Sequence, residues 1–191
     1  MSNAVKLDRL RTLIVDDNAH MINIVKTILR GFGMEHFYDA QDAAEAFSLV
    51  KSESVDLIIV DYQMDLLDGL DFIKLVRTAD DSPAPFIPII MLTAYSERKR
   101  VIAARDAGVT EFCNKPVNAQ ELFRKLISVI DHPRDFVRTK TYFGPDRRRH
   151  DSSKHLGPFR RAEDGDRESL NEFDENQLNT MPKVMDFSAK S

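Results

Sequence analysis

The chain has 191 residues and a formal net charge of −4 at pH 7, which suits one domain with an extension, because domains commonly hold about 100–150 residues. No apolar run approaches the roughly 18 residues that a membrane span needs, and the first ten residues lack the apolar core of a signal peptide. Cys113 is the single cysteine, which excludes an internal disulfide and favours a reducing cytoplasm. We interpret it as a small residue of the core.

The composition changes near residue 131. Residues 1–130 carry dense apolar periodicity, whereas only 15 of the 61 residues from 131 onward are apolar. Such a composition buries too little apolar surface to offset the entropy lost on ordering. We therefore expect one domain over residues 8–131 and a mostly disordered tail over residues 132–191.

The predicted elements of the first 130 residues alternate between strands and helices. A strand at 10–15 precedes a helix that Asn18 caps and Gly31 ends. A weak strand at 35–38, an Ala-rich helix over about 41–51, a continuous aliphatic strand at 56–60 and a helix near 69–77 follow. A strand at 88–92, a helix near 97–106 and a strand at 109–113 come next. Asn118 then caps the last helix, with Glu121 completing a capping box. Five such units predict an α/β fold, a doubly wound five-stranded parallel sheet.

Polar side chains follow four of the predicted strands. Asp16 and Asp17 come directly after the first strand, and Asp61 directly after the third. The fourth and fifth strands are followed closely by Thr93 and Lys115. Because sites in open parallel sheets form beyond the carboxyl ends of the strands, we expect these side chains to converge. Three close carboxylates need a compensating cation, and Mg²⁺ prefers such ligands. The set indicates phosphoryl transfer, with Asp61 as a nucleophile that forms an aspartyl phosphate.

Four motifs resemble the signatures of the bacterial response-regulator receiver domain, the CheY-like family: Val15-Asp16-Asp17, Val60-Asp61, Leu92-Thr93-Ala94 and Lys115-Pro116. The resemblance covers about residues 10–130 and implies a flavodoxin-like receiver fold. It also implies a sensor histidine kinase or phosphotransfer protein as the phosphoryl donor. A downstream protein would dock on the face formed by the fourth helix, the fifth strand and the fifth helix.

The resemblance implies a role for each matching residue. Asp61 would be the phosphoacceptor, and Thr93 and Lys115 would hold phosphoryl oxygens. Thr93 and Phe112 would form the switch that alters the docking face, and Lys115-Pro116 would be a cis peptide. The Mg²⁺ ligands would be Asp16, Asp17, Asp61 and the backbone carbonyl of Gln63.

The tail repeats one unit, because Phe143-Gly-Pro-Asp-Arg-Arg148 recurs as Leu156-Gly-Pro-Phe-Arg-Arg161. Gly-Pro stiffens the backbone, and arginine can fork onto guanine or pair with phosphate. Two such units would suit cyclic di-GMP, and this arginine-rich segment, residues 142–164, resembles that of the Cle group of cyclic-di-GMP-binding receivers. The second copy has Phe159 where the first has Asp146. The candidate nucleotide-binding residues are Tyr142 as a stacking face, Asp146, Arg147, Arg148, Arg160 and Arg161.

Other functions of the tail stay open. It could be a flexible linker or a partner-docking tail, and its basic part could bind nucleic acid or an anionic membrane. No helix-turn-helix, zinc-ligand spacing or catalytic output motif follows residue 131. We therefore expect a stand-alone, non-enzymatic response regulator without sequence-specific DNA binding. The alternative is a second-messenger effector controlled mainly through the tail.

Overall fold

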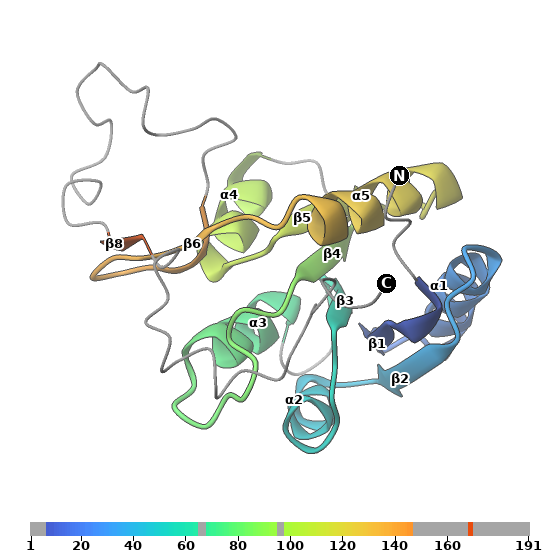
Figure 1. The fold of residues 1–191 in the computed structure, drawn as a ribbon, viewed down its shortest axis with the longest axis horizontal. Coiled ribbons are helices and arrows are strands. Elements are labelled where there is room, and N and C mark those ends of the chain that lie inside the picture. The colour runs from blue at the N-terminus through green and yellow to red at the C-terminus, as the bar shows by residue number, and fades with distance from the viewer. Residues whose placement is uncertain (1–6, 65–67, 95–97, 147–167, 170–191) are drawn as a thin grey trace, which may run out of the picture.

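The computed structural model in Figure 1 describes residues 7–64, 68–94, 98–146 and 168–169. Its main sheet has five parallel strands in the order β2-β1-β3-β4-β5. They are β1 (Arg11–Val15), β2 (His36–Ala40), β3 (Leu57–Asp61), β4 (Ile89–Thr93) and β5 (Glu111–Asn114), and a short 3₁₀ turn at Leu7–Arg9 precedes β1. The strand order reverses beside β1, where such folds place their sites. The predicted doubly wound parallel sheet is confirmed.

Five helices cover the two faces of this sheet (Figure 1). They are α1 (Ala19–Gly31), α2 (Ala43–Ser52), α3 (Gly69–Thr78), α4 (Arg98–Ala107) and α5 (Ala119–Asp131). Buried side chains of α1 and α5 pack in one cluster, and those of α2, α3 and α4 pack in another. Along β3 the side chains alternate between the clusters, with Ile58 and Val60 in one and Leu57 and Ile59 in the other. A strand buried on both faces explains the continuous aliphatic run in the sequence.

The predicted helix starts are confirmed at Asn18 and Asn118. The Asn18 side chain accepts hydrogen bonds from the backbone amides of the first turn of α1, and Asn118 does the same for α5. Each cap satisfies amides that have no partner within the helix. Cys113 is fully buried in the α1–α5 cluster, as predicted, and burial raises the pKa of its thiol to about 11. Its thiol is therefore not a ready nucleophile at neutral pH.

Residues 132–146, which we call the strap, fold against the domain. The strap contains the antiparallel strands β6 (Phe136–Arg138) and β7 (Phe143–Pro145), and β8 (Glu168–Ser169) pairs with β6. Two strap aromatics, Phe136 and Phe143, pack on Phe86 with ring centroids 5.0 and 5.3 Å from its own. The predicted start of disorder at residue 132 is therefore wrong for residues 132–146. Three clustered aromatic rings supply the apolar burial that the average composition hides.

The strap lies close to α3 and α4 (Figure 1), on the part of the domain away from the carboxyl ends of the strands.

Among the described ranges, no helix is both long and apolar enough to cross a membrane.

Candidate functional site

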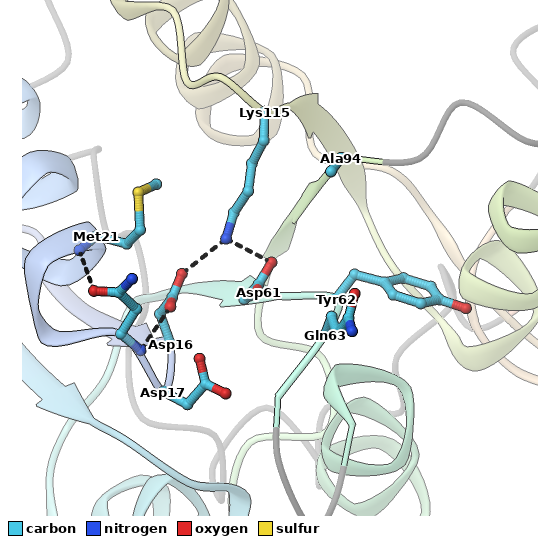
Figure 2. A pocket seen from close by; sticks show the side chains of 9 residues that line it. Asp16, Asp17, Met21, Asp61, Tyr62, Gln63, Ala94 and Lys115 are labelled. Atoms are coloured by element: carbon cyan, nitrogen blue, oxygen red, sulfur yellow. Dashed lines mark hydrogen bonds and ion pairs between the residues drawn. The ribbon is translucent and has the colours of Figure 1, made fainter.

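A pocket of about 310 Å³ opens at the carboxyl ends of β1, β3 and β5. Residues at the ends of these strands point into it because each strand delivers its next polar side chain to the same edge of the sheet. Figure 2 shows the lining, which comprises Asp16, Asp17, Asn18, Met21, Asp61, Tyr62, Gln63, Ala94 and Lys115. The predicted convergence of carboxylates and lysine is therefore observed. The volume is several times that of one water molecule, so it can hold a small anion together with water.

Lys115 lies between two buried carboxylates (Figure 2). Its Nζ is 3.0 Å from Asp16 Oδ2 and 2.9 Å from Asp61 Oδ1. Asp16 and Asp61 are only 2 % and 6 % exposed. Asp16 Oδ1 also accepts a 2.9 Å hydrogen bond from the Asn18 amide, which fixes its orientation. One cation thus joins the ends of β1, β3 and β5.

The charges in this cluster do not balance. Burial raises the pKa of Asp61, and the negative charge of Asp16 raises it further, although Lys115 opposes both effects. Burial alone would lower the pKa of Lys115, but its hydrogen bonds to Asp61 and Asp16 and their charges raise it overall, so the lysine stays charged. Two buried carboxylates therefore share one ammonium group, and Asp17 adds a third acidic side chain to the same pocket. The excess negative charge favours binding of a further cation.

The oxygen donors of the pocket fit a hard divalent cation better than a transition metal. Asp17 is exposed and lines the pocket, yet Figure 2 shows its carboxylate outside the ion pairs that Lys115 makes. Within the described part of the chain, no three His, Cys, Asp or Glu side chains lie close enough together to hold a metal ion. Asp16, Asp17 and Asp61 are the acidic side chains that line this pocket and would hold a metal ion there.

The two predicted switch residues lie on neighbouring strands. Thr93 is the last residue of β4, is buried, and its carbonyl accepts a 2.8 Å hydrogen bond from the Lys115 amide. Its neighbour Ala94 lines the pocket, whereas Thr93 does not. Phe112 on β5 is half-buried and packs against the cluster beneath α2, α3 and α4. The Lys115-Pro116 peptide is cis, as the resemblance implied.

Tyr62, directly after the acceptor candidate, points away from the ion pairs (Figure 2). The guanidinium of Arg100 on α4 lies over its ring, with Cζ 5.7 Å from the ring centroid. This cation–π contact brings the first turns of α4 to the edge of the pocket.

Gly69 supports the site, although its place in the sequence predicted only the start of a helix. A Cβ built on Gly69 would lie 2.0 Å from the carbonyl oxygen of Asp61. The Gly69 amide also donates a 3.1 Å hydrogen bond to the Tyr62 carbonyl. Only a glycine lets α3 begin this close to the end of β3. The Asp68-Gly69 pair, seven and eight residues after Asp61, was the available signal.

The predicted nucleotide-binding residues lie partly outside the described residues. Arg147, Arg148, Arg160 and Arg161 fall in that undescribed part. Asp146 is half-buried at the end of the strap. Tyr142 is only 8 % exposed, and its hydroxyl donates a 2.7 Å hydrogen bond to the Pro145 carbonyl. The Tyr142 ring is buried within the strap, and its stacking role stays a prediction.

Comparison with known proteins identifies the family. The family model described as "Response regulator receiver domain" matches residues 12–127. Chemotaxis protein CheY-3 of Vibrio cholerae is 32 % identical over 128 residues, which cover 67 % of this chain and 97 % of the relative. Chemotaxis protein CheY of Pseudomonas aeruginosa is 32 % identical over 122 residues, covering 64 % of this chain and 97 % of that protein.

A solved structure shows the same arrangement. The chemotaxis response regulator CheY4 of Vibrio cholerae superposes with a TM-score of 0.57 at 29 % identity, covering 63 % of this chain and 98 % of that one. The aligned parts of these relatives thus span nearly their whole length, and the match leaves the C-terminal third of this chain unaccounted for. With a family model that matches more than half of its length and the pocket described above, the chain belongs to the response regulator receiver domain family.

Proposed function

We propose that this chain acts as a response regulator that accepts a phosphoryl group on Asp61 from a histidine kinase or phosphotransfer protein in the cytoplasm. The observation that carries the proposal is the bridge from Lys115 to Asp16 and Asp61 at the mouth of the pocket. This bridge places a nucleophilic carboxylate beside a cation that can neutralise charge on the transferred phosphoryl group. The family membership supports the same chemistry.

In the proposed step, a carboxylate oxygen of Asp61 attacks the phosphorus of a phosphohistidine. The new P–O bond forms as the P–N bond breaks, and the electron pair of that bond leaves with the imidazole, which takes up a proton from solvent. Lys115 neutralises charge on the phosphoryl oxygens while Asp16 keeps its ammonium in place. Thr93 would contribute its hydroxyl by moving toward the phosphoryl group.

Mg²⁺ fits this donor set, and Asp16, Asp17, Asp61 and the Gln63 carbonyl would hold it. When bound, the ion supplies charge neutralisation at the phosphoryl oxygens. Asp17 is exposed and lines the pocket. The Asp16 carboxylate is oriented by the backbone amide of Asn18 and by Lys115.

The output is protein–protein docking on the face formed by α4, β5 and α5, where Phe112 and Thr93 would act as the switch. Phe112 lies opposite Met91 in the β4–β5 register, and Met91 is two residues before Thr93 on β4. A shift of Thr93 therefore reaches Phe112 through adjacent strand positions. The chain is proposed to act without catalysing a reaction on other substrates.

The test is labelling by a small phosphodonor such as acetyl phosphate or phosphoramidate. We expect labelling that needs Mg²⁺, is lost in D61N and persists in D39N, which removes an exposed carboxylate on β2. Persistent labelling of D61N would overturn the assignment of the acceptor.

Cyclic di-GMP binding by the arginine-rich segment is a second proposal, and the Gly-Pro-x-Arg-Arg repeat favours it. Recognition would fall mainly to Arg147, Arg148, Arg160 and Arg161, because Tyr142 is turned into the strap. Calorimetric titration of the full chain should show micromolar binding that is lost when these four arginines are changed to Ala. No binding by the wild-type chain would contradict it, and equal binding of mixed oligonucleotides would indicate a polyanion-binding tail instead.

A further inference from the structure

The strap contacts the first residue of the connection that leads from α4 into β5. A Cβ built on Gly144 of β7 would lie only 3.0 Å from the Cα of Gly108, so these two backbones are in contact. The same Cβ would lie 2.6 Å from the Tyr142 hydroxyl, which donates to the Pro145 carbonyl. The Gly-Pro of the first repeat copy therefore has a structural use, because it lets β7 close onto the end of α4.

Beneath the strap lies Arg77 of α3, a buried arginine that is 3 % exposed. Its Nε donates to the Gly108 carbonyl at 3.1 Å, and its Nη1 donates to the carbonyls of Pro85 and Ile87 at 2.8 and 2.7 Å. The ring of Phe136 covers the guanidinium, with its centroid 5.1 Å from Cζ. The strap thus closes over a charge that ties α3 to the α4–β5 connection.

This closure is not fully favourable. Arg77 Nη2 is buried and has no hydrogen-bond partner among the described residues, and burial lowers the pKa of Arg77 to about 9. When the strap lifts, water can reach this guanidinium and recover part of the cost of burying it. The aromatic packing therefore favours the docked strap, whereas the cost of burying the guanidinium favours its release. This balance suits an element that docks reversibly.

The strap also holds the first residue of β5. Glu111 is 7 % exposed and pairs with Arg134 of the strap and with Lys125 of α5, whose Nζ is 2.8 Å from Glu111 Oε2. Burial alone would raise the pKa of Glu111, but the two cations lower it overall. This side chain joins the strap to both β5 and α5.

Strand β5 connects these strap contacts to the pocket. It has four residues, begins at Glu111, and is followed directly by Lys115, whose side chain bridges Asp16 and Asp61. A phosphoryl group on Asp61 would change the charge that Lys115 faces and draw its ammonium to new oxygens. A displacement at one end of so short a strand alters the geometry of the ion pairs at its other end.

We propose that the strap is an intramolecular occupant of the surface formed by α3, the α4–β5 connection and the start of β5, and that phosphorylation of Asp61 releases it. The inference rests on the proposed function and adds a built-in competitor to it. The docked strap pairs through Arg134 with Glu111 at the start of β5, which belongs to the face that the output partner is proposed to use, so release exposes that part of the face. By linkage, removing strap contacts must favour the phosphorylated state to the same extent that phosphorylation favours release.

Hydrogen exchange measured by mass spectrometry tests the release in the full chain. The reporters are the Thr139 and Asp146 amides, which donate to the carbonyls of Tyr142 and Asp135 within the strap. A two-stranded hairpin is marginal by itself, so these amides should lose protection when the strap lifts. We expect exchange at least about 5-fold faster in the phosphorylated chain, a coupling at the lower end of common values. Unchanged protection in a chain that carries the label would overturn the inference and leave the proposed function standing. No label on Asp61 in the same sample would overturn both.

A pair of variants tests the reciprocal effect. Arg134→Ala removes the strap's ion pair with Glu111, whereas Lys74→Ala removes an equal charge from an exposed i,i+3 pair on α3 that lies outside the strap. We expect R134A to be labelled about 2- to 5-fold faster by phosphoramidate and K74A to match the wild-type chain. Equal rates in all three proteins, or equal acceleration in both variants, would contradict coupling through Glu111.

Discussion

Two buried ion clusters lie at opposite ends of β5 and mirror each other in charge. At the pocket, the cation of Lys115 lies between Asp16 and Asp61. At the strap, the carboxylate of Glu111 lies between Lys125 and Arg134. The first cluster leaves the pKa of Asp61 raised, whereas the second leaves the pKa of Glu111 lowered.

The difference separates a reactive site from a structural contact. Asp61 is held where its ionised form is disfavoured, and such local strain is common at functional sites. Glu111 has partners for its charge, and its ionised form supports the fold. Burial raises the pKa of both carboxyl groups, so the partners around each group decide the sign of the outcome.

The largest expected effect comes from a change that breaks the pocket and spares the strap. In Gly69→Ala the new methyl group would meet the Asp61 carbonyl oxygen at 2.0 Å, so either α3 or the end of β3 must move. We expect the free energy of unfolding to fall by about 3 kcal/mol. We also expect labelling of Asp61 to slow roughly 100-fold, because misplacing a reacting group by about 1 Å has effects of that size. Urea unfolding and labelling kinetics measure the two effects.

Gly31→Ala is the matched control. Gly31 ends α1, and a Cβ built there meets nothing within 4 Å. This change should leave labelling unaltered and raise stability by about 0.5–1 kcal/mol, because alanine loses less backbone entropy than glycine in a helix. If G69A labelled as fast as G31A, the close approach of α3 to Asp61 would have no role in the site.

Breaking the cluster at the strap should lower stability. Glu111→Gln removes the charge that Lys125 and Arg134 share, and we expect a loss of about 1–3 kcal/mol at pH 7, since a buried group loses charged partners. Chemical unfolding of both proteins gives the difference. An unchanged midpoint would mean that the strap ion pair contributes nothing in solution.

The same pair of proteins has a defined pH dependence. The folded pKa of Glu111 lies below its ordinary value of 4.5, so its stabilising effect is complete above that value and is lost as the pH falls through the folded pKa. The stability difference between the wild-type chain and E111Q should therefore be constant near neutral pH and shrink below about pH 4. A difference that grew on acidification would contradict the lowered pKa.

The smallest expected effect has the opposite sign. The folded pKa of Asp61 is raised, so its ionised form destabilises the fold at neutral pH, and that penalty disappears on acidification. Asp61→Asn should raise the free energy of unfolding by about 1 kcal/mol in buffer with a chelator. Thermal unfolding checks this, and a lower midpoint than that of the wild-type chain would show that the pocket is not strained.

The sheet and the pocket could be predicted because their signals are local. Continuous aliphatic runs mark strands buried on both faces, and Asp16 and Asp61 each follow such a run directly, while Lys115 follows the end of β5. The topology of a parallel sheet then brings them together without further information.

The strap could not be predicted in the same way. Its strands have three residues each, and its burial depends on three rings, of which Phe86 lies some fifty residues earlier in the chain. Arg77 and Glu111 gave no signal either, because a charged residue in a helix or strand is usually exposed. Their burial depends on contacts with Gly108 and Arg134 that only the folded chain brings together.

The most direct test of the central claim is to locate the phosphoryl group chemically. The chain is phosphorylated with acetyl phosphate and Mg²⁺ and then reduced with borohydride, which converts an acyl phosphate to an alcohol, and its peptides are sequenced by mass spectrometry. We expect reduction at residue 61 alone, and only after phosphorylation in the presence of Mg²⁺. Reduction at Asp16 or Asp17, or a label found on a histidine, would contradict it.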